Sequence, residues 1–243
     1  MASPLQKRNQ RIAALKQQEQ LTTQNENDRG DVIIPNAQAP KSEWDIVRAS
    51  IQKDVSALKS IKQIEDKLAY KARCLPQYES YISQANIPLD IAVMLMVWLF
   101  DCKDLERAIS LGLYCATHGA TMPAGFKPHV ETFMADATLA WADAQWKAGH
   151  SVSPYFGQIF NLVTTEWDLY DQIIAKYYKL SGLMVLGPNG SNIKHQSEPA
   201  LLYSAKALFQ KAMKKYDKVG VGTRIDEIDK RLIKLQLPLT PEE

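Results

Sequence analysis

Side chains that could carry out chemistry are scattered along this chain of 243 residues, and they are not grouped at the spacings that a reaction needs. Asp168 and Asp171 lie three residues apart in an expected helix and could hold Mg²⁺, but such pairs on a helix surface are usually solvated. The chain has no serine–histidine–aspartate order and no HExxH motif, and its 187–190 turn, GPNG, lacks the ending of a phosphate loop. The sequence therefore predicts no catalytic centre and no cofactor.

The residue types that bind metals also predict no site. Each histidine falls at an expected helix end or in a loop, without a carboxylate or cysteine at a metal-ligand spacing. The cysteines form no CxxC pair, which argues against a zinc site or a disulfide framework and is typical of buried thiols in a reducing cytoplasm. The amino terminus is polar and has no apolar signal region, so we expect no secretory signal. The residues considered are His118, His129, His150, His195, Cys74, Cys102 and Cys115.

The elements that must position any site are organised around residues 91–123. Residues 91–100 carry no polar side chain, which is typical of a helix buried on all sides, and they are too few to cross a bilayer. Asp104 can cap a second helix, which Gly119 closes and after which Pro123 prevents a restart. The pattern predicts an antiparallel helix hairpin whose first helix is almost wholly buried.

A long helix is expected over residues 42–73. Its apolar residues, from Trp44 to Leu68, recur every three or four positions, close to the repeat of a coiled-coil seam. A narrow stripe on a long helix fits either pairing between subunits or a helix laid across its own domain. We expect a homo-oligomer through this stripe, with contacts from Val47, Ile51, Val55 and Leu58.

Helical spacing continues to residue 236 without a notable strand pattern, so the predicted fold is all-α. The hairpins at 91–119 and 200–236 resemble tetratricopeptide units, which predicts partly tetratricopeptide-like packing. The expected divisions are a basic amino-terminal helix or arm (1–20), a flexible linker (21–41), a long-helix region for oligomerisation near DNA (42–90), a central helical core (91–196), a carboxy-terminal hairpin (197–236) and a tail (237–243).

The net charge of +2 hides an asymmetry along the chain. Residues 1–73 hold 13 basic against 9 acidic side chains, residues 74–200 hold 7 against 12, and residues 201–243 hold 9 against 6. Basic ends around an acidic middle point to a polyanion partner for the ends, although ordinary solvated helix surface would give a similar pattern.

Two basic segments are the candidates for contact with DNA phosphates. We expect the contacts in residues 1–73. A short amino-terminal helix would be marginal alone, so this part of the chain is either a disordered tail or an arm that orders on DNA. The candidate residues there are Lys7, Arg8, Arg11 and Lys16 in the arm, and Lys59 and Lys62 on the long helix. The rival surface is Lys211, Lys214, Lys215 and Lys218.

The central stretch resembles the core of the phage small terminase subunit family of temperate, contractile-tailed phages. That family combines an apolar MxVMLW-like helix, a short acidic turn, a helix ending in a histidine–glycine pair, and a Met-Pro dipeptide. The corresponding residues here are 94–98, 101–104, 108–119 and Met122-Pro123, and the likeness covers most of the chain.

The resemblance implies a protein of the bacterial host cytoplasm that binds a packaging or cos site on concatemeric double-stranded viral DNA. It also implies assembly into oligomers and recruitment of the large terminase subunit, which carries the ATPase and nuclease. Family members are labelled the endonuclease subunit, whereas the residues here predict no nuclease centre and no membrane contact. The alternatives are a helical-repeat adaptor that binds only proteins, and a DNA-binding regulator.

Overall fold

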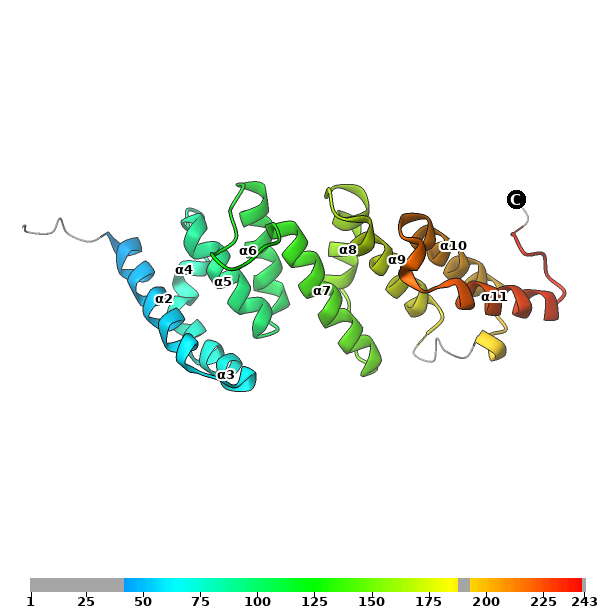
Figure 1. Ribbon diagram of the computed structural model, residues 1–243, viewed down its shortest axis with the longest axis horizontal. Coiled ribbons are helices and arrows are strands. Elements are labelled where there is room, and N and C mark those ends of the chain that lie inside the picture. Colours follow the sequence, from blue (N-terminus) through cyan, green and yellow to red (C-terminus); the bar gives the residue numbers. More distant parts are fainter. Residues whose placement is uncertain (1–41, 188–192, 242–243) are drawn as a thin grey trace, which may run out of the picture. The chain divides into compact units, whose positions relative to one another are not determined.

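The computed structural model describes residues 42–187 and 193–241, and these residues form helices joined by turns, without strands (Figure 1). The all-α prediction is therefore confirmed, while the tetratricopeptide-like packing of the hairpins stays a prediction. The predicted arm and linker lie outside the described residues, and with them Lys7, Arg8, Arg11 and Lys16. None of the described helices is long and apolar enough to cross a membrane.

The described residues form α-helices and short 3-10 helices in the following order along the chain. The α-helices are α2 (Glu43–Ser60), α3 (Ile64–Cys74), α4 (Glu79–Ile82), α5 (Leu89–Asp101), α6 (Leu105–Thr117), α7 (Val130–Lys147), α8 (Tyr155–Thr165), α9 (Asp171–Val185), α10 (Pro199–Lys215) and α11 (Gly222–Lys234). Short 3-10 helices are η1 (Leu75–Tyr78), η2 (Ile193–His195) and η3 (Asp217–Val219).

Helices α5 and α6 form the predicted hairpin. The backbone N–H of Arg107 donates to Asp104 Oδ1 over 3.3 Å, so Asp104 caps α6 as expected. Gly119 has a φ of +66°, and the N–H of Ala120 donates to the carbonyl of Cys115 over 2.9 Å. This left-handed cap satisfies carbonyls that the last helical turn leaves unpaired. The hairpin is confirmed together with both of its caps.

Helix α5 is the centre of the larger core. Leu95, Met96 and Leu99 are fully buried, and the ring of Trp98 meets that of Tyr78 edge-on at a centroid distance of 6.0 Å. Contacts on α5 come from α3, η1, α6 and α7. An apolar helix without a polar face has no side to turn toward water, so it must be covered all round.

The predicted continuous helix over 42–73 is wrong. Helix α2 ends at Ser60 and α3 begins at Ile64, with Gln63 in an extended conformation between them. Side-chain contacts explain the break, since Tyr70 donates a hydrogen bond to Asp54 over 2.9 Å. In one straight helix these two residues would lie about 24 Å apart along the axis, at 1.5 Å per residue.

The carboxy-terminal hairpin, α10 and α11, shares a second core with α9. Helices α9 and α10 approach closely at Gly182, where an added Cβ would lie 2.6 Å from Cε1 of Phe209. Phe209 is fully buried there. A glycine is needed at this position because the aromatic ring occupies the space of a side chain.

Candidate functional site

Lys59 and Lys62 are the two predicted DNA contacts that the structure describes. Lys59 lies in the last turn of α2 and Lys62 in the link before α3, and both are exposed. Neither forms an ion pair with another residue of 42–187 or 193–241. The helix break therefore places both ammonium groups around one exposed turn, where they are free to meet an anion.

A buried carboxylate sets the position of this turn. Asp54 is 8% exposed and accepts hydrogen bonds from Tyr78 Oη (2.7 Å), Gln77 Nε2 (2.8 Å) and Tyr70 Oη (2.9 Å). The bond to Asp54 raises the pKa of Tyr70 to about 12, because ionising the phenol would remove the donated proton. Helices α2 and α3 and the η1 turn are thus tied to one side chain.

The role of Asp54 was not predicted from the sequence, although its position in the apolar stripe of α2 indicates it. The buried face of α2 runs through Val47, Ile51, Asp54 and Leu58, at steps of four, three and four residues. An acidic residue at a core position of an apolar stripe needs hydrogen-bonding partners when it is buried. The stripe therefore indicated a polar junction as well as a packing face.

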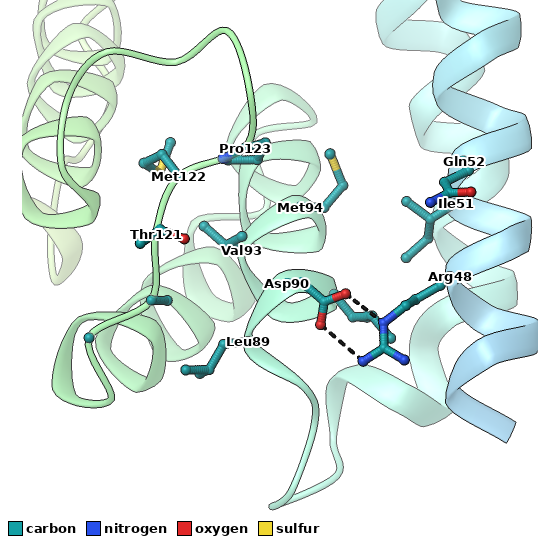
Figure 2. A pocket seen from close by; sticks show the side chains of 13 residues that line it. Arg48, Ile51, Gln52, Leu89, Asp90, Val93, Met94, Thr121, Met122 and Pro123 are labelled. Atoms are coloured by element: carbon teal, nitrogen blue, oxygen red, sulfur yellow. Dashed lines mark hydrogen bonds and ion pairs between the residues drawn. The ribbon is translucent and has the colours of Figure 1, made fainter. Parts of the chain in front are cut away.

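A pocket of about 400 Å³ lies between α2, the first turns of α5 and the loop after α6 (Figure 2). At its edge, Arg48 of α2 holds Asp90 of α5 through two bonds, Nε to Oδ2 at 2.6 Å and Nη2 to Oδ1 at 3.2 Å. Arg48 also bonds Asp45 over 3.1 Å. The bond from Arg48 lowers the pKa of Asp90, because a fixed guanidinium stabilises the ionised carboxylate.

The pocket joins residues from both ends of the central stretch that the sequence singled out. Met94 belongs to the apolar helix, Gly119 ends the second helix, and Met122 and Pro123 form the dipeptide beyond it, and all four line the pocket. Side chains that are separated by almost thirty residues thus meet on one surface beside α2. Their convergence was not visible from spacing, because it depends on how the loop after α6 folds back.

The residues predicted to form a subunit contact lie against the core of their own chain. Val47, Ile51 and Leu58 are buried, and Val55 is partly buried beside them. Of the two roles left open for this stripe, a helix laid across its own domain is the one that these contacts fit. Ile46 on the same helix is 60% exposed, so α2 keeps an apolar residue on its outer side.

The residues considered for metal binding do not converge. Asp171 accepts a bond from Lys215 of α10 over 3.0 Å, so its carboxylate already has a cationic partner. His118 contacts the carbonyl of Tyr114 over 2.8 Å at the end of α6. Within 42–187 and 193–241, no three histidine, cysteine or acidic side chains are grouped as metal ligands.

The rival basic surface occupies α10 and η3. Lys211 lies over the ring of Tyr178, with 5.8 Å from Nζ to the centroid, and Lys215 is paired with Asp171. Lys214 and Lys218 are exposed and form no ion pair with a described residue. Residues 199–241 hold nine basic and four acidic side chains, against seven and five for residues 43–78. The carboxy-terminal segment, residues 199–241, therefore carries a larger basic excess than residues 43–78.

Comparison with known proteins gives a consistent result. The family model described as "Phage small terminase subunit" matches residues 48–172. The chain is 31% identical over 199 residues to the "Probable terminase, endonuclease subunit" of Haemophilus phage HP1 (strain HP1c1), covering 79% of this chain and 71% of that protein.

A second relative is the "Terminase, endonuclease subunit" of Escherichia phage P2, with 25% identity over 190 residues. That match covers 76% of this chain and 72% of the relative. No solved structure matches the chain.

Proposed function

Because this chain belongs to the phage small terminase subunit family, we propose that it binds the packaging site of concatemeric viral DNA and directs the large subunit to cut and package that DNA. The observation that carries the proposal is the family match over 48–172, which runs from α2 to the first residues of α9 and includes the whole α5–α6 hairpin. Association with viral DNA and with the large terminase subunit follows from this family role.

The proposed DNA contacts are the turn of Lys59 and Lys62 and the basic arm that precedes α2. Exposed ammonium groups without ion pairs can neutralise phosphates at little cost, since no internal bond has to be broken. Contacts of this kind position a protein on the duplex, whereas contacts to base edges select the sequence. The rival contact surface is the α10–η3 face, which the charge balance of the described residues supports.

We also propose that the functional form is a homo-oligomer. Val47, Ile51 and Leu58 are covered by their own chain, so a second chain would meet α2 on its outer side, where Ile46 is exposed. A mass measurement of the native assembly at micromolar concentration tests this proposal. A monomer would contradict it.

The relatives are named endonuclease subunits, and we propose that this chain directs the cut without making it. The pairing of Asp171 with Lys215 supports this proposal, because a divalent cation at Asp168 and Asp171 would have to displace the lysine. Incubating the protein alone with cognate DNA and Mg²⁺ or Mn²⁺ should leave the DNA intact. Cutting that Asp171→Ala abolishes would overturn the proposal.

Salt dependence of DNA binding decides between the two basic surfaces. Each phosphate contact releases about one counterion, so removing two should flatten the slope of log affinity against log salt by roughly two. We expect this change for Lys59→Ala/Lys62→Ala, and no change for the matched pair Lys214→Ala/Lys218→Ala. If only the second pair changes the slope, the duplex lies on the carboxy-terminal hairpin.

Two further readouts of the same preparation separate the classes of function. Retention on DNA that weakens with salt distinguishes a terminase subunit or a regulator from a protein-only adaptor. Stimulation of the ATPase of the large subunit then distinguishes the terminase subunit from a regulator.

A further inference from the structure

A groove between α7 and α9 is built from two matching stripes of side chains. Each helix contributes four residues at positions i, i+3, i+4 and i+7, which places them on one face over about 10 Å of helix, or two turns. The groove has a volume of about 420 Å³. Its residues are Asp136, Leu139, Ala140 and Asp143 of α7, and Lys176, Lys179, Leu180 and Leu183 of α9; we call this surface the α7–α9 groove.

The two walls of the α7–α9 groove carry opposite charge. The α7 wall contributes both carboxylates, and the α9 wall contributes both ammonium groups. Two of these four charges are already engaged, since Asp143 pairs with Lys147 at 2.5 Å and Lys179 donates to the carbonyl of Val219 over 2.8 Å. Asp136 and Lys176 form no ion pair with any residue that the structure describes.

The floor of the groove is apolar. Leu180 is buried, while Leu139 and Leu183 are half-buried and keep surface that a ligand could cover. Desolvation raises the pKa of Asp136, because nearby protein atoms replace water that would stabilise the ionised carboxylate, and Lys176 only partly offsets this effect. Asp136 is nevertheless exposed, so a cation carried by a partner can reach its carboxylate.

Charged walls on either side of an apolar floor select one kind of ligand. A DNA duplex fits poorly, because the α7 wall would repel its phosphates. An amphipathic helix fits, since it can lay an apolar stripe on Leu139, Leu180 and Leu183 while its two flanks carry charges of opposite sign.

We propose that the α7–α9 groove is the docking site for an amphipathic helix of the large terminase subunit. The helix presents apolar residues to the leucine floor, basic residues to Asp136 and Asp143, and acidic residues to Lys176 and Lys179. This inference rests on the proposed function, which supplies the partner, and it adds the surface and the chemistry of the contact. Because the two walls differ in charge, the basic flank of the helix faces α7 and its acidic flank faces α9.

Exchanging the free charges of the walls tests the inference. The variant Asp136→Lys/Lys176→Asp keeps composition and net charge but places like charges opposite the flanks of the bound helix. We expect affinity for the large subunit to fall by at least about tenfold, because like-charge contacts across an interface are strongly unfavourable. ATPase stimulation should fall with it at concentrations of large subunit near the wild-type Kd.

A matched control is Asp168→Lys/Lys127→Asp, which makes the same two exchanges at exposed residues outside the groove. It should bind the large subunit as wild type does. Both variants should unfold at the wild-type temperature and retain DNA with the wild-type salt slope, which shows that the fold and the DNA surface are intact.

Three outcomes would overturn the inference. Unchanged affinity of the wall-exchange variant would exclude the groove, and an equal loss in the control would show a general charge effect. A changed native mass with unchanged binding of the large subunit would assign the groove to contact between copies of this chain. Failure of the wild-type protein to bind the large subunit would instead overturn the proposed function on which the inference rests.

Discussion

The α5–α6 hairpin and the α2–α3 region are stabilised by different interactions. The hairpin buries a helix whose residues 91–100 carry no polar side chain, and local caps at Asp104 and Gly119 define where its second helix begins and ends. The α2–α3 region has no glycine or proline at its break, and it turns where Tyr70, Gln77 and Tyr78 reach Asp54. Apolar packing holds the first region, whereas the second combines the buried apolar face of α2 with hydrogen bonds to one buried carboxylate.

This difference shows which kind of interaction a sequence makes visible. Caps and apolar runs act between residues a few positions apart, so their effect can be read locally. The bonds to Asp54 join residues 16 to 24 positions apart, and they form only after α3 has folded back. Substitutions in the two regions should therefore differ in how much they lower the free energy of unfolding, and in whether further substitutions recover the loss.

The largest effect is expected in the hairpin, for Leu95→Ala. Leu95 is fully buried in α5, so the substitution removes buried apolar surface and leaves a cavity. We expect a loss of about 2–5 kcal/mol in the free energy of unfolding, measured by urea denaturation. The control Ile64→Ala, at a side chain that is 74% exposed, should change it by less than about 0.5 kcal/mol. Equal losses would contradict the core position of α5.

An intermediate effect is expected at the polar junction, for Asp54→Ala. The substitution removes the shared acceptor of three donors and leaves the buried hydroxyl of Tyr78 only Ser50 Oγ, at 3.0 Å, so we expect a cost of about 1–3 kcal/mol in the free energy of unfolding. Tyr70→Phe removes a single donor and should cost less, about 1 kcal/mol. Combining Asp54→Ala with Tyr70→Phe and Tyr78→Phe should recover part of the loss, because the hydroxyls that lost the carboxylate are then absent. If the triple variant lost the sum of the three single losses in the free energy of unfolding, the three side chains would not form a shared junction.

The smallest effect is expected where the two regions meet, for Asp90→Asn. The pair of Arg48 and Asp90 is partly exposed, so its removal should cost only about 0.5–1 kcal/mol at neutral pH. The folded-state pKa of Asp90 lies below its ordinary value, so the contribution is present above the unfolded pKa and is lost as pH falls through the folded one. Urea denaturation of both proteins should show a difference near pH 7 that disappears on acidification. A difference that persists in acid would rule out the ion pair as its cause.

The sequence identified many residues of the candidate site, but it did not show which of them lie together on one surface. The sequence identified Met94, Gly119, Met122 and Pro123 as members of one resemblance, without indicating that they line one pocket. It identified Lys59 and Lys62 as basic positions on a helix, whereas the structure places them around a turn. Neither arrangement follows from spacing, because both depend on where chain segments return to one another.

The sequence by itself determined the helical fold, the buried α5 helix, the caps of its partner and the family of the protein. These features rest on periodicity, on capping residues and on local motifs, all of which act within a few turns of helix. Only the tertiary structure decided that α2 stops at Ser60 and that its apolar stripe covers its own chain. It also decided that the stripes of α7 and α9 face each other with opposite charge. Such features arise from long-range contacts, whose energies outweigh the small helix propensity of a few linking residues.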